Sequence, residues 1–273
     1  MFSHTHKPLI MGILNVTPDS FSDGGKYSGI DDALKQAERM LAEGVDIIDI
    51  GGESTRPGSE PVAAAEQIQR VIPVISAIRQ QLKSTILISI DTTSGAVAKA
   101  ALAAGANIIN DVSAGRDDSA ILTLAAQTNT PIILMHSRGA PKTMQDNPYY
   151  EDAIREVIKV LEQRIDAALK AGIKKENIAL DPGIGFGKRK QDNLDLLAHL
   201  DAIVALGFPV LLGASRKRFM GALCNVEEPS ELVTATAVTT ALGVMAGVQV
   251  FRVHDVKENR QAADVAWAIK QSR

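Results

Sequence analysis

The strongest chemical signal in the sequence is an acidic residue followed by a glycine-rich loop. Asp181 ends a short apolar run, Ile178–Leu180, and residues 182–188 read Pro-Gly-Ile-Gly-Phe-Gly-Lys. A proline and three alternating glycines disfavour regular structure and let a ligand approach the backbone closely. The spacing fits neither a P-loop nor a dinucleotide fingerprint, whose last glycine is replaced by Lys188. A carboxylate beside one presented aromatic, Phe186, suits a flat, nitrogen-rich ring better than a phosphate.

Other apolar runs in the chain also end at polar or small residues. These ends are Asn15, Gly51–Gly52, Asp91, Asn110, His136, Asp181, Ser215 with Lys217, and Arg252 with His254. In a closed barrel of parallel strands the carboxyl ends meet at one mouth, where active sites lie. Carboxylates, amides and cations gathered there predict a small-molecule site. A helix cap is the alternative for Asp91, Asn110 or Asp181 taken singly. The three together with Lys217 favour a ligand.

Eight strand–helix units account for the chain and must position these residues. Strands are expected at residues 8–14, 46–50, 85–90, 108–109, 132–135, 178–180, 210–212 and 249–253. Helices are expected to end near residues 44, 82, 104, 127, 171, 206, 247 and 270, and glycine follows several of them. The loops after the first two strands are long. The pattern favours an α/β fold, a single (β/α)8 TIM barrel domain spanning residues 1–273, over a doubly wound sheet.

The composition argues against several classes of partner. The chain has 29 basic and 32 acidic residues, so no basic surface for nucleic acid or an anionic membrane is expected. No apolar run approaches the length of a membrane span, and the first eight residues lack a signal pattern. The single cysteine, Cys224, can form no internal disulfide, which favours a reducing compartment. We expect a cytoplasmic protein.

Three other features have structural interpretations. His136 is expected to be a hydrogen-bonded histidine rather than a metal ligand, because no second His or Cys lies at ligand spacing. Met135 is read first as a packing residue. The run Arg216–Arg218 is ordinarily a solvated basic face. Its place after the seventh strand, where barrels often bind phosphate, raises the odds of a ligand role.

Two long motifs make the sequence similar to a known family. Residues 11–25 (MGILNVTPDSFSDGG) and 46–58 (DIIDIGGESTRPG) resemble the two signatures of the dihydropteroate synthases. Shorter matches follow in order at Leu134–His136, Lys142–Gln145, Asp181–Lys188, Gly213–Lys217 and Arg252–Val256. Departures are confined to Ser137, where Met is common, and to Thr93–Gly95. The resemblance covers nearly the whole chain.

The resemblance implies an activity in folate synthesis. Such an enzyme joins 6-hydroxymethyl-7,8-dihydropterin pyrophosphate to 4-aminobenzoate, releases pyrophosphate, uses Mg²⁺ and is a sulfonamide target. Pyrophosphate is thought to leave first, so that the arylamine captures a pterin methylene cation. Asp181 is placed to accept two N–H groups of the pterin, and Asn110 can donate and accept on another edge. Asp91 is expected to stabilise the cation electrostatically.

The resemblance also implies four groups of site residues. The pterin would be bound by Asp91, Asn110, Met135, Asp181, Gly213 and Lys217. Pyrophosphate would be bound by Asn15, Thr55, Arg56, Arg252 and His254, with Asn15 as the metal ligand. 4-Aminobenzoate would be bound by Phe21, Thr55, Pro57, Phe186, Ser215 and Lys217. The catalytic residues would be Asp91, Lys217, Arg252 and His254.

Assembly and loop closure complete the expectations. The helix over residues 230–247 lacks a charged face after Glu231, and the resemblance implies a homodimer, so we expect an isologous dimer through this helix. The two signature loops are expected to be mobile and to close on the phosphates before 4-aminobenzoate binds. The alternatives are a corrinoid-linked pterin methyltransferase and a pterin-binding module without catalysis. Asn15, Phe21 and Arg56 argue against the methyltransferase.

Overall fold

The computed structural model describes residues 7–17, 26–54, 58–82, 85–139 and 143–273. Eight parallel strands form one sheet with the order β6-β5-β4-β3-β2-β1-β8-β7. A parallel bridge between Leu180 and Val210 joins the two ends of that order, so the sheet closes into a barrel. The strands are β1 Leu9–Asn15, β2 Ile47–Gly51, β3 Leu87–Asp91, β4 Ile108–Asp111, β5 Ile132–Met135, β6 Ile178–Asp181, β7 Leu211–Leu212 and β8 Val250–Val253.

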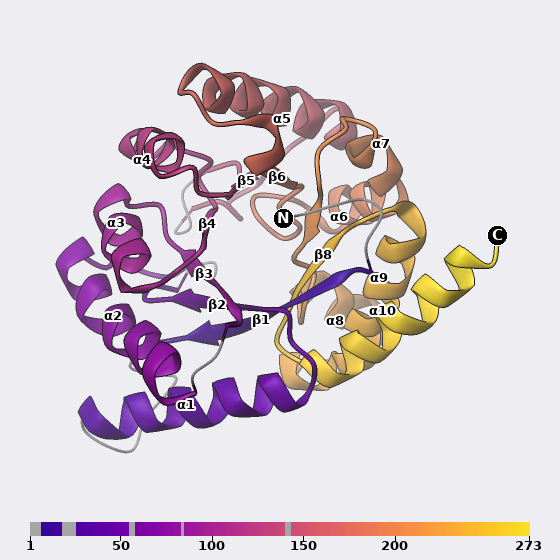
Figure 1. The fold of residues 1–273 in the computed structure, drawn as a ribbon. Helices are drawn as coiled ribbons and strands as arrows, with labels where there is room; N and C mark the ends of the chain where they lie inside the picture. The colour runs from indigo at the N-terminus through magenta and orange to yellow at the C-terminus, as the bar shows by residue number, and fades with distance from the viewer. Residues whose placement is uncertain (1–6, 18–25, 55–57, 83–84, 140–142) are drawn as a thin grey trace.

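The helices surround this barrel as an outer ring (Figure 1). They are α1 Lys26–Ala42, α2 Ala64–Gln81, α3 Gly95–Ala104, α4 Ala120–Thr128, α5 Ala153–Lys170, α6 Lys190–Ala198, α7 Leu200–Val204, α8 Arg218–Cys224, α9 Val233–Ala246 and α10 Val256–Gln271. Short 3₁₀ turns lie at Lys175–Asn177 and Pro229–Glu231. The predicted (β/α)8 barrel is therefore confirmed.

Two of the predicted helices are divided in the structure. The helix expected to run down to Gly247 consists of α8, a 3₁₀ turn and α9. Asn225 ends α8 in the left-handed conformation, at φ 54°, and Pro229 follows four residues later. The helix expected to end near residue 206 divides at His199, whose backbone is not helical. Local backbone chemistry, which apolar spacing does not report, divides both helices.

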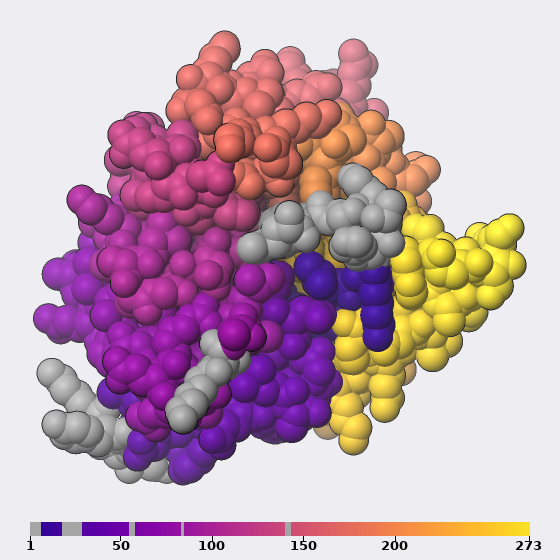
Figure 2. Space-filling view, in the orientation of Figure 1, coloured from indigo at the N-terminus to yellow at the C-terminus, as the bar shows by residue number. Residues whose placement is uncertain are grey.

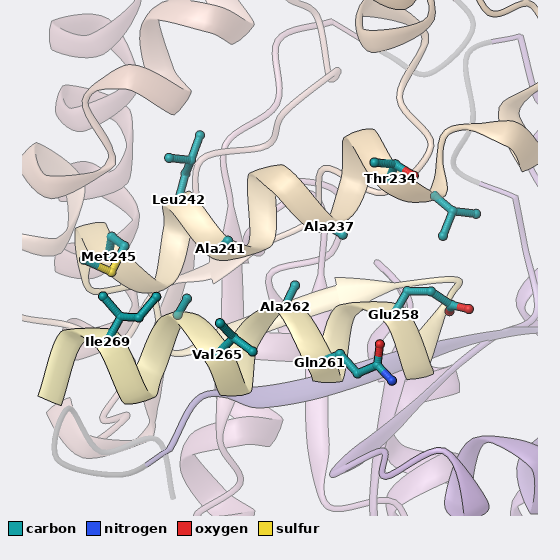
Figure 3. A pocket seen from close by; sticks show the side chains of 12 residues that line it. Thr234, Ala237, Ala241, Leu242, Met245, Glu258, Gln261, Ala262, Val265 and Ile269 are labelled. Atoms are coloured by element: carbon teal, nitrogen blue, oxygen red, sulfur yellow. The ribbon is translucent and has the colours of Figure 1, made fainter. Parts of the chain in front are cut away.

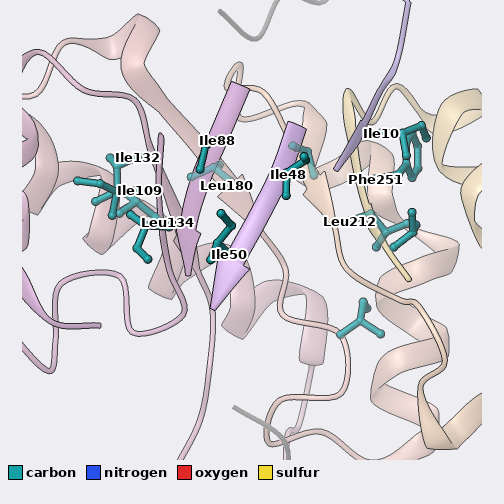
Figure 4. Packing of buried hydrophobic residues seen from close by; sticks show 14 of the residues in the cluster. Ile10, Ile48, Ile50, Ile88, Ile109, Ile132, Leu134, Leu180, Leu212 and Phe251 are labelled. Carbon is teal, nitrogen blue, oxygen red and sulfur yellow. The ribbon is translucent and has the colours of Figure 1, made fainter. Parts of the chain in front are cut away.

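Alternation along the strands produces two separate cores. Successive strand side chains point to opposite faces, so one set faces the helices. Figure 4 shows this outer set, which includes Ile10, Ile48, Ile50, Ile88, Ile109, Ile132, Leu134, Leu180, Leu212 and Phe251. The other set fills the barrel. We call its lowest level the apolar layer, which consists of Met11, Ile47, Ile108, Ile133, Ala179, Leu211 and Val250.

The first described residue contacts the C-terminal helix α10 on the surface. Lys7 forms an ion pair of 2.8 Å with Asp264 of α10, and Figure 2 shows the first described residues, in indigo, against the yellow C-terminal helix.

Among the described residues, no helix combines the length and the apolar character that crossing a membrane requires.

Candidate active site

Polar residues begin one step above the apolar layer. Counting two residues further along these seven strands, and adding Ser89 of β3, which pairs with Asp49, gives what we call the polar layer. It consists of Ile13, Asp49, Ser89, Asn110, Met135, Asp181, Gly213 and Arg252. The next inward positions include Asn15, Gly51, Asp91, Ser215 and His254. Most of the residues that the sequence placed in the pterin and pyrophosphate sites therefore share one face at the carboxyl ends of the strands.

Arg252 lies between two carboxylates in this layer. Its Nε donates to Asp49 Oδ2 at 2.6 Å, and its Nη2 donates to Asp91 Oδ2 at 2.7 Å. Asn110 Nδ2 lies 3.3 Å from the same Asp49 oxygen, at the weak end of the hydrogen-bond range. Asp49 thus joins two predicted site residues, Asn110 and Arg252, and Arg252 in turn contacts a third, Asp91. Sequence reasoning missed Asp49, although an acid inside the buried run Ile47–Gly51 is a detectable signal.

Burial perturbs the pKa of two predicted acids. Burial raises the pKa of Asp91 to about 7; the cation of Arg252 opposes this rise, and the negative charge of Asp49 adds to it. Burial also raises the pKa of Asp181 to about 6, against the N–H of Gly183 and the cation of Lys217. Two carboxyl groups that titrate near neutrality at a barrel mouth indicate a functional site.

The strand-end residues Asp91, Asn110 and Asp181 do not cap the helices that follow them. The N-caps of α3, α4 and α6 are Ser94, Ser119 and Arg189, so the capping alternative fails for Asp91, Asn110 and Asp181. Asp181 Oδ1 accepts the N–H of Gly183 at 2.7 Å and so shapes its own loop. The ligand interpretation remains.

The glycine-rich loop packs tightly against the loop after β5. Gly183 and Gly187 have positive φ angles of 67° and 61°. A Cβ on Gly183 would lie 1.8 Å from the carbonyl oxygen of His136, and one on Gly187 would lie 2.1 Å from that of Arg138. Only glycine fits at these two positions.

Lys188 fastens this loop from inside, and sequence reasoning assigned it no role. Its buried Nζ lies 2.9 Å from His136 Nδ1 and donates to the carbonyl oxygens of Gly183 and Phe186 at 2.8 and 3.1 Å. Three acceptors suit an ammonium, while burial lowers the pKa of Lys188 to about 7. Burial and the nearby cation of Lys188 lower the pKa of His136 to about 2. His136 is therefore a neutral, hydrogen-bonded histidine, as expected.

The basic run after β7 divides into three different environments. Arg216 pairs with Asp255, and Arg218 is exposed. Lys217 places its Nζ 4.3 Å from the centroid of the Phe186 ring, which brings together two residues predicted for 4-aminobenzoate. Only the middle residue of the run thus faces the predicted site.

Other predicted residues have mixed outcomes. The hydroxyl of Ser215 lies 2.9 Å from His254 Nδ1 and accepts the N–H of His254 at 3.1 Å. A Cβ on Gly51 would lie 3.6 Å from both Asn15 Oδ1 and Asp91 Cβ, so these two residues flank Gly51. Four predicted residues lie outside the described part of the chain, as does most of the first signature loop. They are Phe21, Thr55, Arg56 and Pro57.

This geometry defines a class of protein. A (β/α)8 barrel with buried acids of raised pKa, a lysine and an arginine at its carboxyl-end mouth is an enzyme scaffold that acts on a small molecule. Within the described residues, no three His, Cys, Asp or Glu side chains come together as a metal centre.

Comparisons with known proteins specify the class further. Residues 11–254 match the family described as pterin binding enzyme. The chain is 49% identical to the dihydropteroate synthase of Streptococcus pyogenes over 257 residues, which are 94% of this chain and 93% of that one.

Solved structures agree with this match. A Yersinia pestis dihydropteroate synthase with a sulfonamide drug complex has 43% identity and a TM-score of 0.91, covering 97% of this chain and 95% of that one. The Xanthomonas albilineans enzyme with 4-aminobenzoic acid has 44% identity and a TM-score of 0.89, covering 97% and 93%. The chain belongs to the pterin binding enzymes and, within them, to the dihydropteroate synthases.

Proposed function

We infer that this protein makes 7,8-dihydropteroate from 6-hydroxymethyl-7,8-dihydropterin pyrophosphate and 4-aminobenzoate. The methylene C–O bond breaks and its electron pair leaves with pyrophosphate, the arylamine nitrogen forms the new C–N bond, and that nitrogen loses one proton. The observation that carries this inference is the polar layer, in which Asp181, Asn110 and Arg252 face the barrel interior near the carboxyl ends of three strands. Purified protein given both substrates and Mg²⁺ should form dihydropteroate and pyrophosphate in equal amounts.

The same assay separates the alternatives. A pterin-binding module without catalysis would bind a pterin and form neither product. A corrinoid-linked methyltransferase would not consume 4-aminobenzoate. Either result would end the proposal.

Asp181, Asn110 and Lys217 form the proposed pterin subsite. Ionised Asp181 can accept two parallel N–H donors from the aminopyrimidine edge, although one of its oxygens already accepts the N–H of Gly183. Asn110 is held by Asp49, so its amide is oriented before a ligand arrives. Met135 and Gly213 lie in the same layer and supply an apolar wall with space beside it.

Arg252, His254 and Asn15 form the described part of the proposed pyrophosphate subsite. Arg252 offers a planar cation, and His254 and Asn15 lie one step higher on β8 and β1. Thr55 and Arg56 would complete the subsite. Mg²⁺ fits this donor set, because it keeps several waters and binds through few protein oxygens plus substrate phosphates. Asn15 would hold the ion with its amide oxygen, and the ion would neutralise charge on the leaving pyrophosphate.

Asp91 would serve the first half of the reaction, the loss of pyrophosphate, and Phe186 the second half, the capture of the cation by 4-aminobenzoate. Ionised Asp91 lies beside Arg252 and would stabilise the positive charge that builds on the pterin methylene group. Phe186, next to Lys217, would hold one face of 4-aminobenzoate, with Phe21, Pro57 and Ser215 around it. A sulfonamide, which resembles 4-aminobenzoate in shape, should compete with it.

We also propose that the protein is a homodimer in the cytoplasm. The outer faces of α9 and α10 form an open groove of about 610 Å³ with an almost wholly apolar lining, and Figure 3 shows Leu242 and Val265 on these two helices. Their exposed fractions, 61% and 62%, are high for leucine and valine. Val233, Thr234, Ala237, Ala241, Leu242, Met245, Glu258, Gln261, Ala262, Val265, Ala266 and Ile269 line the groove.

This apolar groove tests the dimer proposal. A second copy of the same surface, related by a twofold axis, would cover it. Light scattering should show a dimer for the wild type and a monomer for Leu242→Asp with Val265→Asp. A monomeric wild type at micromolar concentration would refute the dimer. Reducing conditions fit the single, exposed Cys224.

A further inference from the structure

Asp49 is a buried charge that no substrate can touch. Its side chain is 0% exposed, and it lies in the polar layer on β2. One of its oxygens, Oδ2, takes both Arg252 Nε at 2.6 Å and Asn110 Nδ2 at 3.3 Å. Any effect of Asp49 on a bound substrate must therefore pass through these two side chains.

Two carboxylates fix the plane of the Arg252 guanidinium. Asp49 engages Nε and Asp91 engages Nη2, which are donors on the same edge of the group. A planar cation held at two points on one edge cannot rotate about its long axis. Its contacts with described residues use only that edge, so the Nη1–Nη2 end remains as a donor fork for an anion.

Stability alone does not account for an acid at this position. The second oxygen of Asp49, Oδ1, is buried and has no partner within the described residues, and the same holds for Asp91 Oδ1. Such atoms cost stability, and an apolar side chain in place of a buried ion pair is often neutral or stabilising. An apolar residue at position 49 would leave Arg252 attached at one point only.

We propose that Asp49 is a positioning residue, which holds the guanidinium of Arg252 in the orientation that receives the departing pyrophosphate. This role rests on the proposed function, because it supposes that Arg252 binds pyrophosphate. Asp49 contributes to the pterin side more weakly, through its longer contact with Asn110.

Asp49→Asn and Asp49→Ala test the proposal, with Asp46→Asn as the matched control. Asp46 precedes β2 and also pairs with an arginine, Arg260, at 3.0 Å, but at the opposite end of the barrel. The same acid-to-amide change therefore breaks an Asp–Arg pair far from the mouth. Asp49→Asn keeps the shape of the side chain, so a folding failure of Asp49→Ala does not end the test.

Calorimetry with inorganic pyrophosphate and Mg²⁺ gives the first readout. Both Asp49 variants should bind pyrophosphate about tenfold more weakly or worse. Their affinity for a pterin without the diphosphate should fall by a smaller factor. Asp46→Asn should lower the melting temperature only. Unchanged pyrophosphate affinity in Asp49→Asn, or an equal loss in Asp46→Asn, would overturn the proposal.

A double-mutant cycle separates positioning from general damage. Arg252→Lys keeps a cation but removes the planar group that Asp49 orients. In this background Asp49→Asn should cost less than about twofold more in pyrophosphate affinity. If the double variant loses pyrophosphate affinity by the product of the two separate factors, Asp49 acts independently of Arg252. Dihydropteroate formation by the wild type tests the proposed function separately, so the two failures are distinguishable.

Discussion

Two neighbouring levels of the barrel interior lie on the same strands and differ in nearly every physical property. The apolar layer is fully buried and consists only of hydrophobic side chains. The polar layer, two residues further along, holds Asp49, Asn110, Asp181 and Arg252. Here Asp49 Oδ1 and Ser89 Oγ are buried without a partner in the described part of the chain. One step of the pleat thus separates a level that holds the fold together from one that receives a ligand.

This comparison shows that the polar site lowers the stability of the folded chain. A raised pKa means that the ionised form of a buried carboxyl group is less stable in the folded chain than in water. The apolar layer below them and the outer core around them supply the compensating burial. Substitutions in the two layers should therefore affect different measurements.

The largest effect on stability is expected from the apolar layer. Ile108→Ala deletes three heavy atoms from a fully buried position and should lower the free energy of unfolding by about 2–5 kcal/mol. Denaturant unfolding measures this loss. The kcat/KM of the protein that remains folded should not change, and a selective loss of kcat/KM would show that the two layers are not separable.

Asp91→Asn should have the largest effect on chemistry. A group that stabilises charge in the transition state contributes about a hundredfold to the rate, so single turnover should slow by that factor while pterin affinity stays nearly intact. Because the pKa of Asp91 is about 7, the wild-type rate should rise as pH increases through 7, and the variant should lack this rise. Collapsed binding with an unchanged chemical rate would make Asp91 a ground-state contact.

Asp181→Asn should act on binding. Replacing a double acceptor by an amide turns one attractive hydrogen bond into a clash between donors. Pterin binding should weaken by about 2–3 kcal/mol, the range for hydrogen bonds to charged groups. Calorimetry with a pterin ligand measures this, and an unchanged affinity would remove Asp181 from the pocket.

The smallest predicted effect is on the pH dependence of pterin binding. Asp181 is protonated below its raised pKa of about 6, and the neutral acid can no longer accept two N–H groups. Affinity should therefore fall by about tenfold for each pH unit below 6 and level off above it. The variant Asp181→Asn should lack this dependence. A wild-type curve of the same shape as that of the variant would contradict the assignment.

Much of the architecture can be predicted from the sequence, because the strands are short buried runs with sharp ends. Seven of the eight predicted strands end within one residue of the observed carboxyl end, and Ile132–Met135 is predicted without error. The location of the predicted acids can be inferred from the same strand ends, because an acid directly after a buried run lies at the mouth in any barrel. The chain around Asn225 could not be predicted, since its backbone turn interrupts a continuous apolar pattern.

The residues missed by sequence reasoning owe their roles to contacts across the fold. Asp49 looks like an isolated acid until β8 places Arg252 beside it, 203 residues away in sequence. Lys188 ends the glycine-rich loop in sequence, but its Nζ contacts His136, which directly follows β5. The run Arg216–Arg218 offers three equal cations in sequence, and only the packing around Asp255 and Phe186 distinguishes them.

The most direct test of this account is one crossed measurement on two variants, Ile108→Ala and Asp181→Asn. The free energy of unfolding and the pterin affinity are measured for both at pH 7. Ile108→Ala should lose stability and keep its affinity. Asp181→Asn should lose affinity and keep or gain stability, because the ionised Asp181 carboxylate, with its raised folded-state pKa, opposes folding above pH 6. If both variants lose stability and affinity together, the division between the two layers is wrong.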